Sequence, residues 1–451
     1  MREPHSRYLK ALGARILSEA NDLKRTPDAL ARELGRDPAE IAAVIAGVSD
    51  VETAQGVVRE MAARYPVAFA DLWLDPLDTE SGVVVVTAAQ SAATSRVFER
   101  PNATGRLSPY YEYRDTAMSR GAPYKPEWIK ELRTVADDNP GNPELAYNKG
   151  HLMHQVTYFV GEVNFYWEAV GERHSAEMNT GDSAYISPFV PHTFASRNPA
   201  HAGHIIAVTY SDGLRRAINS ISHLSAGDLA SIVPRQGIAH SGFSAQLARH
   251  ASADHLEPSQ LAARAGISET RIRALLAGAA PERGEVAVLA AALGIREQDL
   301  HLSASTPPLV VLGRARDVQE RGYPDGNAPS YRFRDLARPV NQPGLKAFEI
   351  SVFSADSAAA VMSHSLHEYL YVLGDQQVLL YWGADHMREL APGDSVYVAP
   401  FVPHKLAAPG GTGRVLSIRL MGALTDAVLE ELGSYAPGSL ERVVQEHTRW
   451  F

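Results

Sequence analysis

Cysteine is absent from the 451-residue chain, which excludes disulfide bridges, a thiolate nucleophile and metal sites built on sulfur. Positive charge is also scarce, because the chain has 43 Lys and Arg residues but 52 Asp and Glu residues, for a net charge of −9. Proteins that bind nucleic-acid phosphates usually carry an excess of positive charge instead. No stretch approaches the ~18 apolar residues of a membrane helix, and charges interrupt the N-terminal segment. We therefore expect a soluble cytoplasmic protein without nucleic-acid or membrane partners, whose metal ligands would be His, carboxylate or amide groups.

A helical pattern occurs twice. The segment TPDALARELGRDPAEIAAVIAG (26–47) aligns without a gap with EPSQLAARAGISETRIRALLAG (257–278). In each copy apolar residues recur at helical spacing, Gly35 or Gly266 ends the first helix, and polar residues start the second. The repeat predicts a helix-turn-helix inside each of two small helical modules.

A longer repeat is rich in short runs of alternating apolar and polar residues, separated by Gly, Asp and Pro. Such runs predict antiparallel strands joined by tight turns. The matched segments are 110–117 with 330–337, 151–167 with 364–382, and 181–195 with 393–407. The chain therefore reads as a helical module and a β-unit, followed by a second copy of both.

This order predicts five regions. The N-terminal helical module is expected at 1–80 and the first β-unit at 81–215. A linker and the second helical module follow at 216–304, the second β-unit at 305–425, and a C-terminal helix or tail at 426–451.

The sequence of the predicted strands in each β-unit resembles that of a known fold. G-D-x-x-Y-x-x-P-F-V-P-H, preceded about forty residues earlier by H-x-x-x-(Q/E), is similar to the two ligand-bearing segments of a cupin, a double-stranded β-helix of jelly-roll type. The resemblance implies a mixed α and β fold, in which a helix-turn-helix module plus a cupin barrel is repeated in tandem.

The β-repeat carries a metal-ligand pattern in both copies. His151, Gln155 and His192 of the first copy can occupy one face of an octahedral metal and leave positions open for substrate and dioxygen. Because an amide is a weak ligand, Gln155 could instead be structural. His154 should face away, since neighbouring residues of a strand alternate sides. The second copy carries a possible second metal site of His364, Glu368 and His404.

Polar residues beside the first triad have apolar counterparts in the second copy. Asn148 corresponds to Val361, and Tyr113 corresponds to Phe333. These groups could hold an anion next to a metal, because amide and phenol groups donate hydrogen bonds. The comparison indicates that the first barrel is catalytic and that the second is structural, with or without a metal.

Two basic residues of the first copy are likewise replaced in the second copy. Lys24 of the first helical module corresponds to His255, and Arg106 corresponds approximately to Gly326. Arg96 and Arg100 are rivals of Arg106 for the role of anion ligand. Lys and Arg suit a doubly charged head group because they form charge-assisted hydrogen bonds.

The whole arrangement resembles a family of phosphonate-processing mononuclear iron oxygenases, that of 2-hydroxyethylphosphonate dioxygenase and methylphosphonate synthase. The resemblance rests on the duplicated helical module and cupin and on the motifs N-x-x-H-x-x-x-Q and P-F-V-P-H. The resemblance implies a cytoplasmic, homo-oligomeric enzyme that uses Fe(II) and O2 without α-ketoglutarate. The residues implied to bind the phosphonate are Lys24, Arg106, Tyr113 and Asn148.

One position departs from part of this family. Some dioxygenases carry a Glu ligand six residues before the last His, where this chain has Ile186. Gln155 is then the third ligand, giving a 2-His-1-Gln site, or the protein supplies only two ligands. The substrate is expected to be 2-hydroxyethylphosphonate, cleaved between C1 and C2. The favoured products are hydroxymethylphosphonate and formate, and methylphosphonate is the alternative. Val156, Ile186 and Phe189 could influence that choice.

A helix-turn-helix joined to a cupin is also typical of transcription regulators that sense a small molecule. Residues 1–50 carry eight basic and eight acidic side chains, and residues 248–304 carry six and seven. Neither module has the positive excess of a major-groove reader, so the regulator is the weaker interpretation. A sugar-isomerase or storage-type cupin leaves the asymmetric loss of polar groups unexplained.

Overall fold

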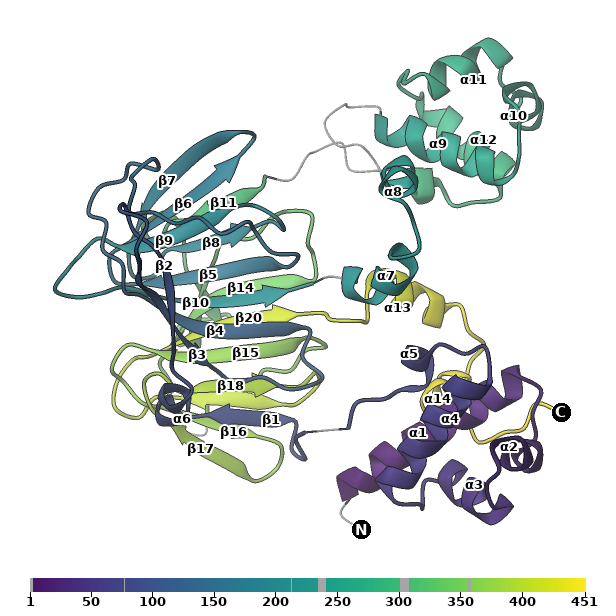
Figure 1. The fold of residues 1–451 in the computed structure, drawn as a ribbon, viewed down its shortest axis with the longest axis horizontal. Helices are drawn as coiled ribbons and strands as arrows, with labels where there is room; N and C mark the ends of the chain where they lie inside the picture. Colours follow the sequence, from purple (N-terminus) through teal and green to yellow (C-terminus); the bar gives the residue numbers. More distant parts are fainter. Residues whose placement is uncertain (1–2, 77, 212, 234–240, 301–307, 356–357) are drawn as a thin grey trace. The chain divides into compact units, whose positions relative to one another are not determined.

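A computed structural model describes residues 3–76, 78–211, 213–233, 241–300, 308–355 and 358–451 (Figure 1). The chain forms two compact units. The major unit comprises Met1–Asp212, Val310–Arg338 and Gln342–Phe451, and the minor unit comprises Gly213–Leu309 with Pro339–Asn341. No helix in the described ranges is long and apolar enough to cross a membrane.

The N-terminal helices of the major unit begin and end where the repeat predicts. The Thr26 hydroxyl accepts a hydrogen bond from the Ala29 N–H, and Gly35 ends the following helix at φ +70°, a conformation that costs a glycine little. Leu30, among others, fills the core of this module. The helices are α1 Glu3–Asp22, α2 Pro27–Leu34, α3 Pro38–Ile45, α4 Val51–Arg64 and α5 Phe69–Leu72.

The minor unit holds the second copy of the helical pattern. Gly266 ends α10 at φ +67°, as Gly35 ends α2, and Leu261 and Ile272 lie in the core. The elements are α7 Leu214–Ile221, α8 Ala226–Ile232, α9 Ser241–Ala253, α10 Pro258–Ala265, α11 Glu269–Leu276, α12 Arg283–Leu293 and the short 3₁₀ helix η1 Glu297–Leu300.

The first sandwich of the major unit consists of a seven-stranded and a three-stranded antiparallel sheet around one core. The larger sheet runs in the order β11 Val310–Gly313, β8 Ser183–Ile186, β5 His154–Val160, β10 His204–Tyr210, β4 Tyr124–Glu131, β3 Leu107–Asp115 and β2 Arg96–Pro101. The smaller sheet runs in the order β7 Glu172–Met178, β6 Val163–Ala169 and β9 His192–Ser196.

The second sandwich repeats this plan. Its larger sheet runs in the order β1 Val83–Val86, β18 Ser395–Val398, β15 His367–Leu373, β20 Gly413–Leu420, β14 Leu345–Val352, β13 Tyr331–Asp335 and β12 Arg321–Tyr323. Its smaller sheet runs in the order β17 His386–Leu390, β16 Val378–Trp382 and β19 His404–Ala407. The remaining elements are α6 Ala88–Ala93, η2 Ala315–Asp317, α13 Asp426–Gly433 and α14 Leu440–Val444. The mixed α and β class with antiparallel sheets, predicted from the sequence, is confirmed.

The two larger sheets share a core and exchange edge strands. Tyr158 of β5 and Tyr369 of β15 are fully buried in the same apolar cluster. Strand β1 pairs with β18 of the second sandwich, although its residues lie in the range expected for the first β-unit. Strand β11 pairs with β8 of the first sandwich. The expected boundary at 304 and 305 lies outside the described residues.

Candidate metal centre

The three residues of the first triad lie on or beside strands of both sheets of the first sandwich. Gln155 is on β5 opposite Thr209, His192 starts β9, and His151 precedes β5. Gln155 and His192 are buried. His154 lies on the other face of β5, where its Nδ1 is 2.7 Å from the Tyr185 hydroxyl oxygen and burial lowers its pKa to about 4.

The hydrogen bonds of the two histidines fix their tautomers. The Nδ1 of His151 lies 2.7 Å from the Met153 carbonyl oxygen, and the Nδ1 of His192 lies 2.8 Å from that of Val190. Because a carbonyl oxygen only accepts, each Nδ1 carries a proton and each neutral ring presents an Nε2 lone pair. Burial lowers the pKa of His192 to about 4, which favours the neutral ring.

Gln155 presents a third lone pair to the same place. Its Nε2 donates to the Thr157 hydroxyl oxygen at 2.7 Å, so its Oε1 points toward His151 and lies 3.1 Å from the Nε2 atom. These two atoms are both acceptors and do not bond to each other without a cation between them.

The spacing of these atoms fits a metal ion. Adjacent ligands of an octahedral ion with bonds of about 2.1 Å are about 3.0 Å apart, close to the 3.1 Å between His151 Nε2 and Gln155 Oε1. The rings of His151 and His192 are nearly perpendicular, at 88°, with centroids 5.3 Å apart. The residues present therefore fit a divalent metal.

Asn148 directs an amide N–H toward the same centre. Its Oδ1 accepts from the backbone N–H groups of Gly150 and His192, both at 2.9 Å. This fixes the amide so that Nδ2 donates to His192 Nε2 at 3.1 Å, the lone pair that a bound metal would take over. An N–H group held there can donate to an oxygen of a metal-bound ligand.

Gly150 is required where the ligand segment meets the loop before β9. Its φ is +73°, and an added Cβ would lie 2.4 Å from the Phe189 carbonyl carbon. Phe189 also has a positive φ, +58°, and its N–H donates to the His151 carbonyl oxygen at 2.8 Å. The close approach of these two backbones places His151 and His192 together.

The charge of Arg100 on β2 acts on Tyr113 of β3 and on His192. Burial raises the pKa of Tyr113 to about 12, while the charge of Arg100 opposes the rise. The same charge is among the causes that lower the pKa of His192. The Arg100 guanidinium lies 5.1 Å from the centroid of the Tyr111 ring.

Glu127 on β4 is a further charged residue near the candidate centre that the sequence pattern did not indicate. Burial raises the pKa of its carboxyl group, and His151 is among the charges that oppose this rise. The register β3–β4 pairs Glu127 with Asp115, and the register β13–β14 pairs Phe348 with Asp335. Aligning these strand pairs would have shown a carboxyl group in place of a phenyl ring.

Two residues predicted to bind the phosphonate, Arg106 and Lys24, make contacts away from the triad. Arg106 is exposed in the turn between β2 and β3, where its backbone N–H donates to the Asn102 Oδ1 at 3.0 Å. Lys24 has φ +57°, as its counterpart His255 has φ +52°. The Nζ of Lys24 donates to the Asn21 carbonyl oxygen at 3.2 Å and lies 5.4 Å from the centroid of the Trp450 ring.

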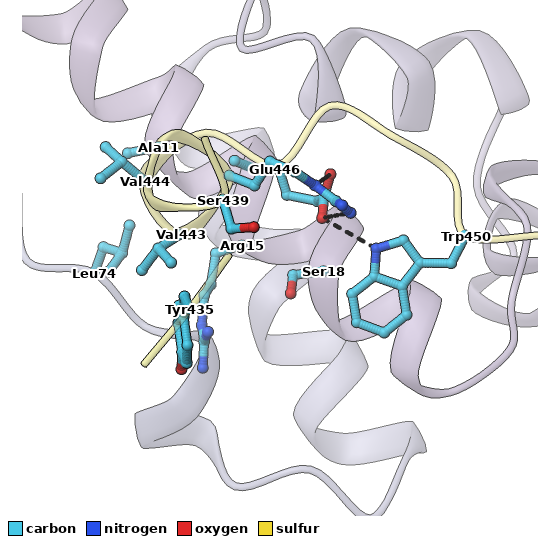
Figure 2. A pocket seen from close by; sticks show the side chains of 12 residues that line it. Ala11, Arg15, Ser18, Leu74, Tyr435, Ser439, Val443, Val444, Glu446 and Trp450 are labelled. Atoms are coloured by element: carbon cyan, nitrogen blue, oxygen red, sulfur yellow. Dashed lines mark hydrogen bonds and ion pairs between the residues drawn. The ribbon is translucent and has the colours of Figure 1, made fainter. Parts of the chain in front are cut away.

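Trp450 also borders a cavity of about 600 Å³ formed by α1 and the C-terminal segment. Figure 2 shows its indole N–H directed at the Glu446 carboxylate, at 3.0 Å. This cavity has Arg15 and Ser18 on its α1 side.

The residues expected to influence the product occupy three different environments. Ile186 lies directly opposite Gln155 in the β5–β8 register and is fully buried. Val156 is in the core between the two larger sheets. Phe189 is 63% exposed. Of these three, Ile186 is the one that packs in the core of the first sandwich.

Comparison with known proteins finds chains that match this one over nearly its whole length. Methylphosphonate synthase from Nitrosopumilus maritimus (strain SCM1) is 35% identical, over 98% of this chain and 96% of that protein. The structure of Streptomyces albus HEPD with 2-hydroxyethylphosphonate and Fe(II) bound has a TM-score of 0.87 and 34% identity, over 98% of this chain and 99% of that one. A structure of a single-residue variant of 2-hydroxyethylphosphonate dioxygenase, at 21% identity and a TM-score of 0.75 over 94% of this chain and 99% of that one, shares the fold. No family model matches the chain.

Proposed function

Because the chain belongs to the family of methylphosphonate synthase and 2-hydroxyethylphosphonate dioxygenase, we propose that it is an Fe(II)- and O2-dependent oxygenase that cleaves the C1–C2 bond of 2-hydroxyethylphosphonate. The observation that carries the proposal is the meeting of His151, Gln155 and His192 in the first sandwich, where His151 Nε2 lies 3.1 Å from Gln155 Oε1 and the two imidazole rings have centroids 5.3 Å apart. We assign both sandwiches to the cupin fold, each preceded by a helix-turn-helix module.

The ligand set explains the charge of the substrate. Two neutral imidazoles and a neutral amide leave the two positive charges of Fe(II) unbalanced, which favours a dianionic ligand in a half-buried site. Fe(II) bound here would supply coordination positions for substrate and O2. The histidine Nδ1–H groups hold the rings in place, as outer-shell hydrogen bonds do in other metal sites.

The phosphonate oxygens would be held by groups that donate without titrating near neutral pH. Tyr113, whose pKa is raised to about 12 by burial, stays a neutral donor, and Asn148 directs its amide N–H at the centre. We assign the arginine of this site to Arg100 rather than Arg106, because the charge of Arg100 acts on both Tyr113 and His192. Lys24 remains a proposed ligand of the phosphonate from the helical module.

The reaction needs no second organic substrate. One O2 and one 2-hydroxyethylphosphonate contain all the atoms of hydroxymethylphosphonate, formate and one proton, and the substrate supplies all four electrons. No α-ketoglutarate is therefore expected. The protein positions the substrate and excludes water from the reacting carbons.

Methylphosphonate is the second candidate product, and the 35% sequence identity with the Nitrosopumilus enzyme supports it. In that case the same two reactants give methylphosphonate, bicarbonate and one proton. The two reactions differ in whether the one-carbon phosphonate gains oxygen or hydrogen. Ile186, opposite Gln155, packs where it could influence that step.

Phosphorus NMR of the Fe(II)-loaded protein after aerobic incubation with 2-hydroxyethylphosphonate tests the proposal, with formate assayed in the same tube. Hydroxymethylphosphonate with stoichiometric formate supports the dioxygenase. Methylphosphonate supports the synthase and rejects the favoured product. Unchanged substrate contradicts both.

A further inference from the structure

We propose that the second sandwich binds its own divalent transition-metal ion through His364, Glu368 and His404. Their ligand atoms lie within 4.8 Å of one another. Glu368 and His404 are buried, at 0% and 2% exposure. The inference concerns a site separate from the proposed reaction centre and does not depend on the phosphonate chemistry.

The two histidines have the same fixed tautomer as those of the first sandwich. The Nδ1 of His364 lies 3.1 Å from the Leu366 carbonyl oxygen, and the Nδ1 of His404 lies 3.0 Å from that of Val402. Both Nδ1 atoms therefore carry protons, so Nε2 is the atom of each ring that can offer a lone pair to a metal ion.

Both lone pairs face one carboxylate oxygen. Glu368 Oε2 lies 3.1 Å from His364 Nε2 and 3.0 Å from His404 Nε2. The buried His404 Nε2 has no hydrogen-bond partner among the described residues. A metal ion among the three ligand atoms would satisfy all of them, the buried His404 Nε2 included.

The other oxygen of Glu368 is held from behind. Oε1 accepts hydrogen bonds from the Ser417 hydroxyl and, at 2.8 Å, from the Arg419 Nε–H. The Arg419 guanidinium in turn lies 5.4 Å from the Phe348 ring centroid. These contacts orient Oε2 toward the histidines, as supporting hydrogen bonds orient carboxylate ligands at metal sites.

The ligand distances and types indicate the metal class. Separations of 3.0 and 3.1 Å match adjacent positions of an ion with bonds of about 2.1 Å, and two imidazoles with one carboxylate suit Mn, Fe, Co, Ni or Zn rather than Ca or Mg. The role is structural, because Phe333 and Val361 replace the hydrogen-bonding Tyr113 and Asn148. The ion would link β15 of the larger sheet to β19 of the smaller one.

Co(II) titration of the metal-free, full-length protein tests the inference through cobalt absorption and the bound metal per chain. The wild type should bind about two ions, and His192→Leu and its positional equivalent His404→Leu about one each.

A wild-type endpoint of one ion, with none bound by a folded His192→Leu protein, would overturn the proposal. The wild-type titration alone decides the count if either variant fails to fold. Turnover of 2-hydroxyethylphosphonate plays no part in this readout, so a failure of the proposed function and a failure of the second site give different results.

Discussion

Substituting Gly150 by alanine should damage the metal centre more than it damages the fold. The new Cβ would lie 2.4 Å from the Phe189 carbonyl carbon and 2.5 Å from its Cα, where carbon atoms normally stay ~3.5–4.0 Å apart. The two backbones must therefore separate by about 1 Å. The moving segments carry His151 and His192, whereas metal–ligand bonds tolerate only about 0.2 Å.

The cost has two parts that a matched variant separates. Gly105 has a similar φ, +79°, but an added Cβ meets nothing within 4 Å. Gly105→Ala should therefore lose only the conformational cost of a left-handed residue, about 1–2 kcal/mol. Gly150→Ala should lose that amount plus an overpacking cost of about 1–3 kcal/mol.

Urea unfolding of both metal-free variants measures these stabilities, and Co(II) titration in the His404→Leu background, which lacks the proposed second site, measures the affinity of the first site. We expect Gly105→Ala to bind metal like the wild type and Gly150→Ala to bind it at least about tenfold more weakly, which corresponds to about 1.4 kcal/mol. Equal stability losses in the two variants, together with wild-type metal affinity in Gly150→Ala, would refute the reasoning.

Three further expectations concern single side chains. Gln155→Ala should abolish turnover because it removes a ligand, and full activity of an iron-loaded variant would show that Gln155 is structural. Arg100→Ala should raise the KM for 2-hydroxyethylphosphonate by about tenfold or more, in keeping with the loss of a charge-assisted hydrogen bond, whereas Arg106→Ala should leave it within about twofold; the reverse order in steady-state kinetics would reassign the anion ligand. Glu131 is fully buried with no hydrogen-bond partner for either carboxylate oxygen in the described part of the chain, and burial raises its pKa well above 4.5. Its protonated form stabilises the fold below about pH 4.5, and that contribution is lost as the pH rises toward the folded-state pKa. As the pH rises from about 5 to 8, the wild type should therefore lose free energy of unfolding that Glu131→Gln keeps, so chemical unfolding should show the stability difference shifting in favour of the variant. A stability difference that does not change with pH would contradict the raised pKa.

The helices and the proximity of His151, Gln155 and His192 could be predicted because each leaves a pattern in the sequence. Thr26 and Gly35 mark the two ends of α2 by capping alone, and the second copy repeats the pattern at Gly266. The spacing of His151, Gln155 and His192 recurs in the second copy, so the comparison of the two copies singles out the residues that approach one another.

The orientation of the side chains proposed to bind the anion could not be predicted because it depends on strand register. The β2–β3 pairing shifts between Phe98 and Glu99, and a shift of one residue moves a side chain to the opposite face. The sequence alone therefore did not separate Arg100 from Arg106. Glu127 was missed for a related reason, since its partner Asp115 is known only from the β3–β4 register.

The exchange of β1 and β11 makes the two copies of the repeat interdependent. A fragment cut at the repeat boundary would carry β1 without its partner β18, and would leave the β8 edge that β11 covers open to solvent. Unpaired strand edges recruit other chains. Each half thus covers a strand edge of the other half and protects it from aggregation. Proteolysis or gene splitting between the two copies would not give two intact halves unless both edge strands were returned to their own sheets.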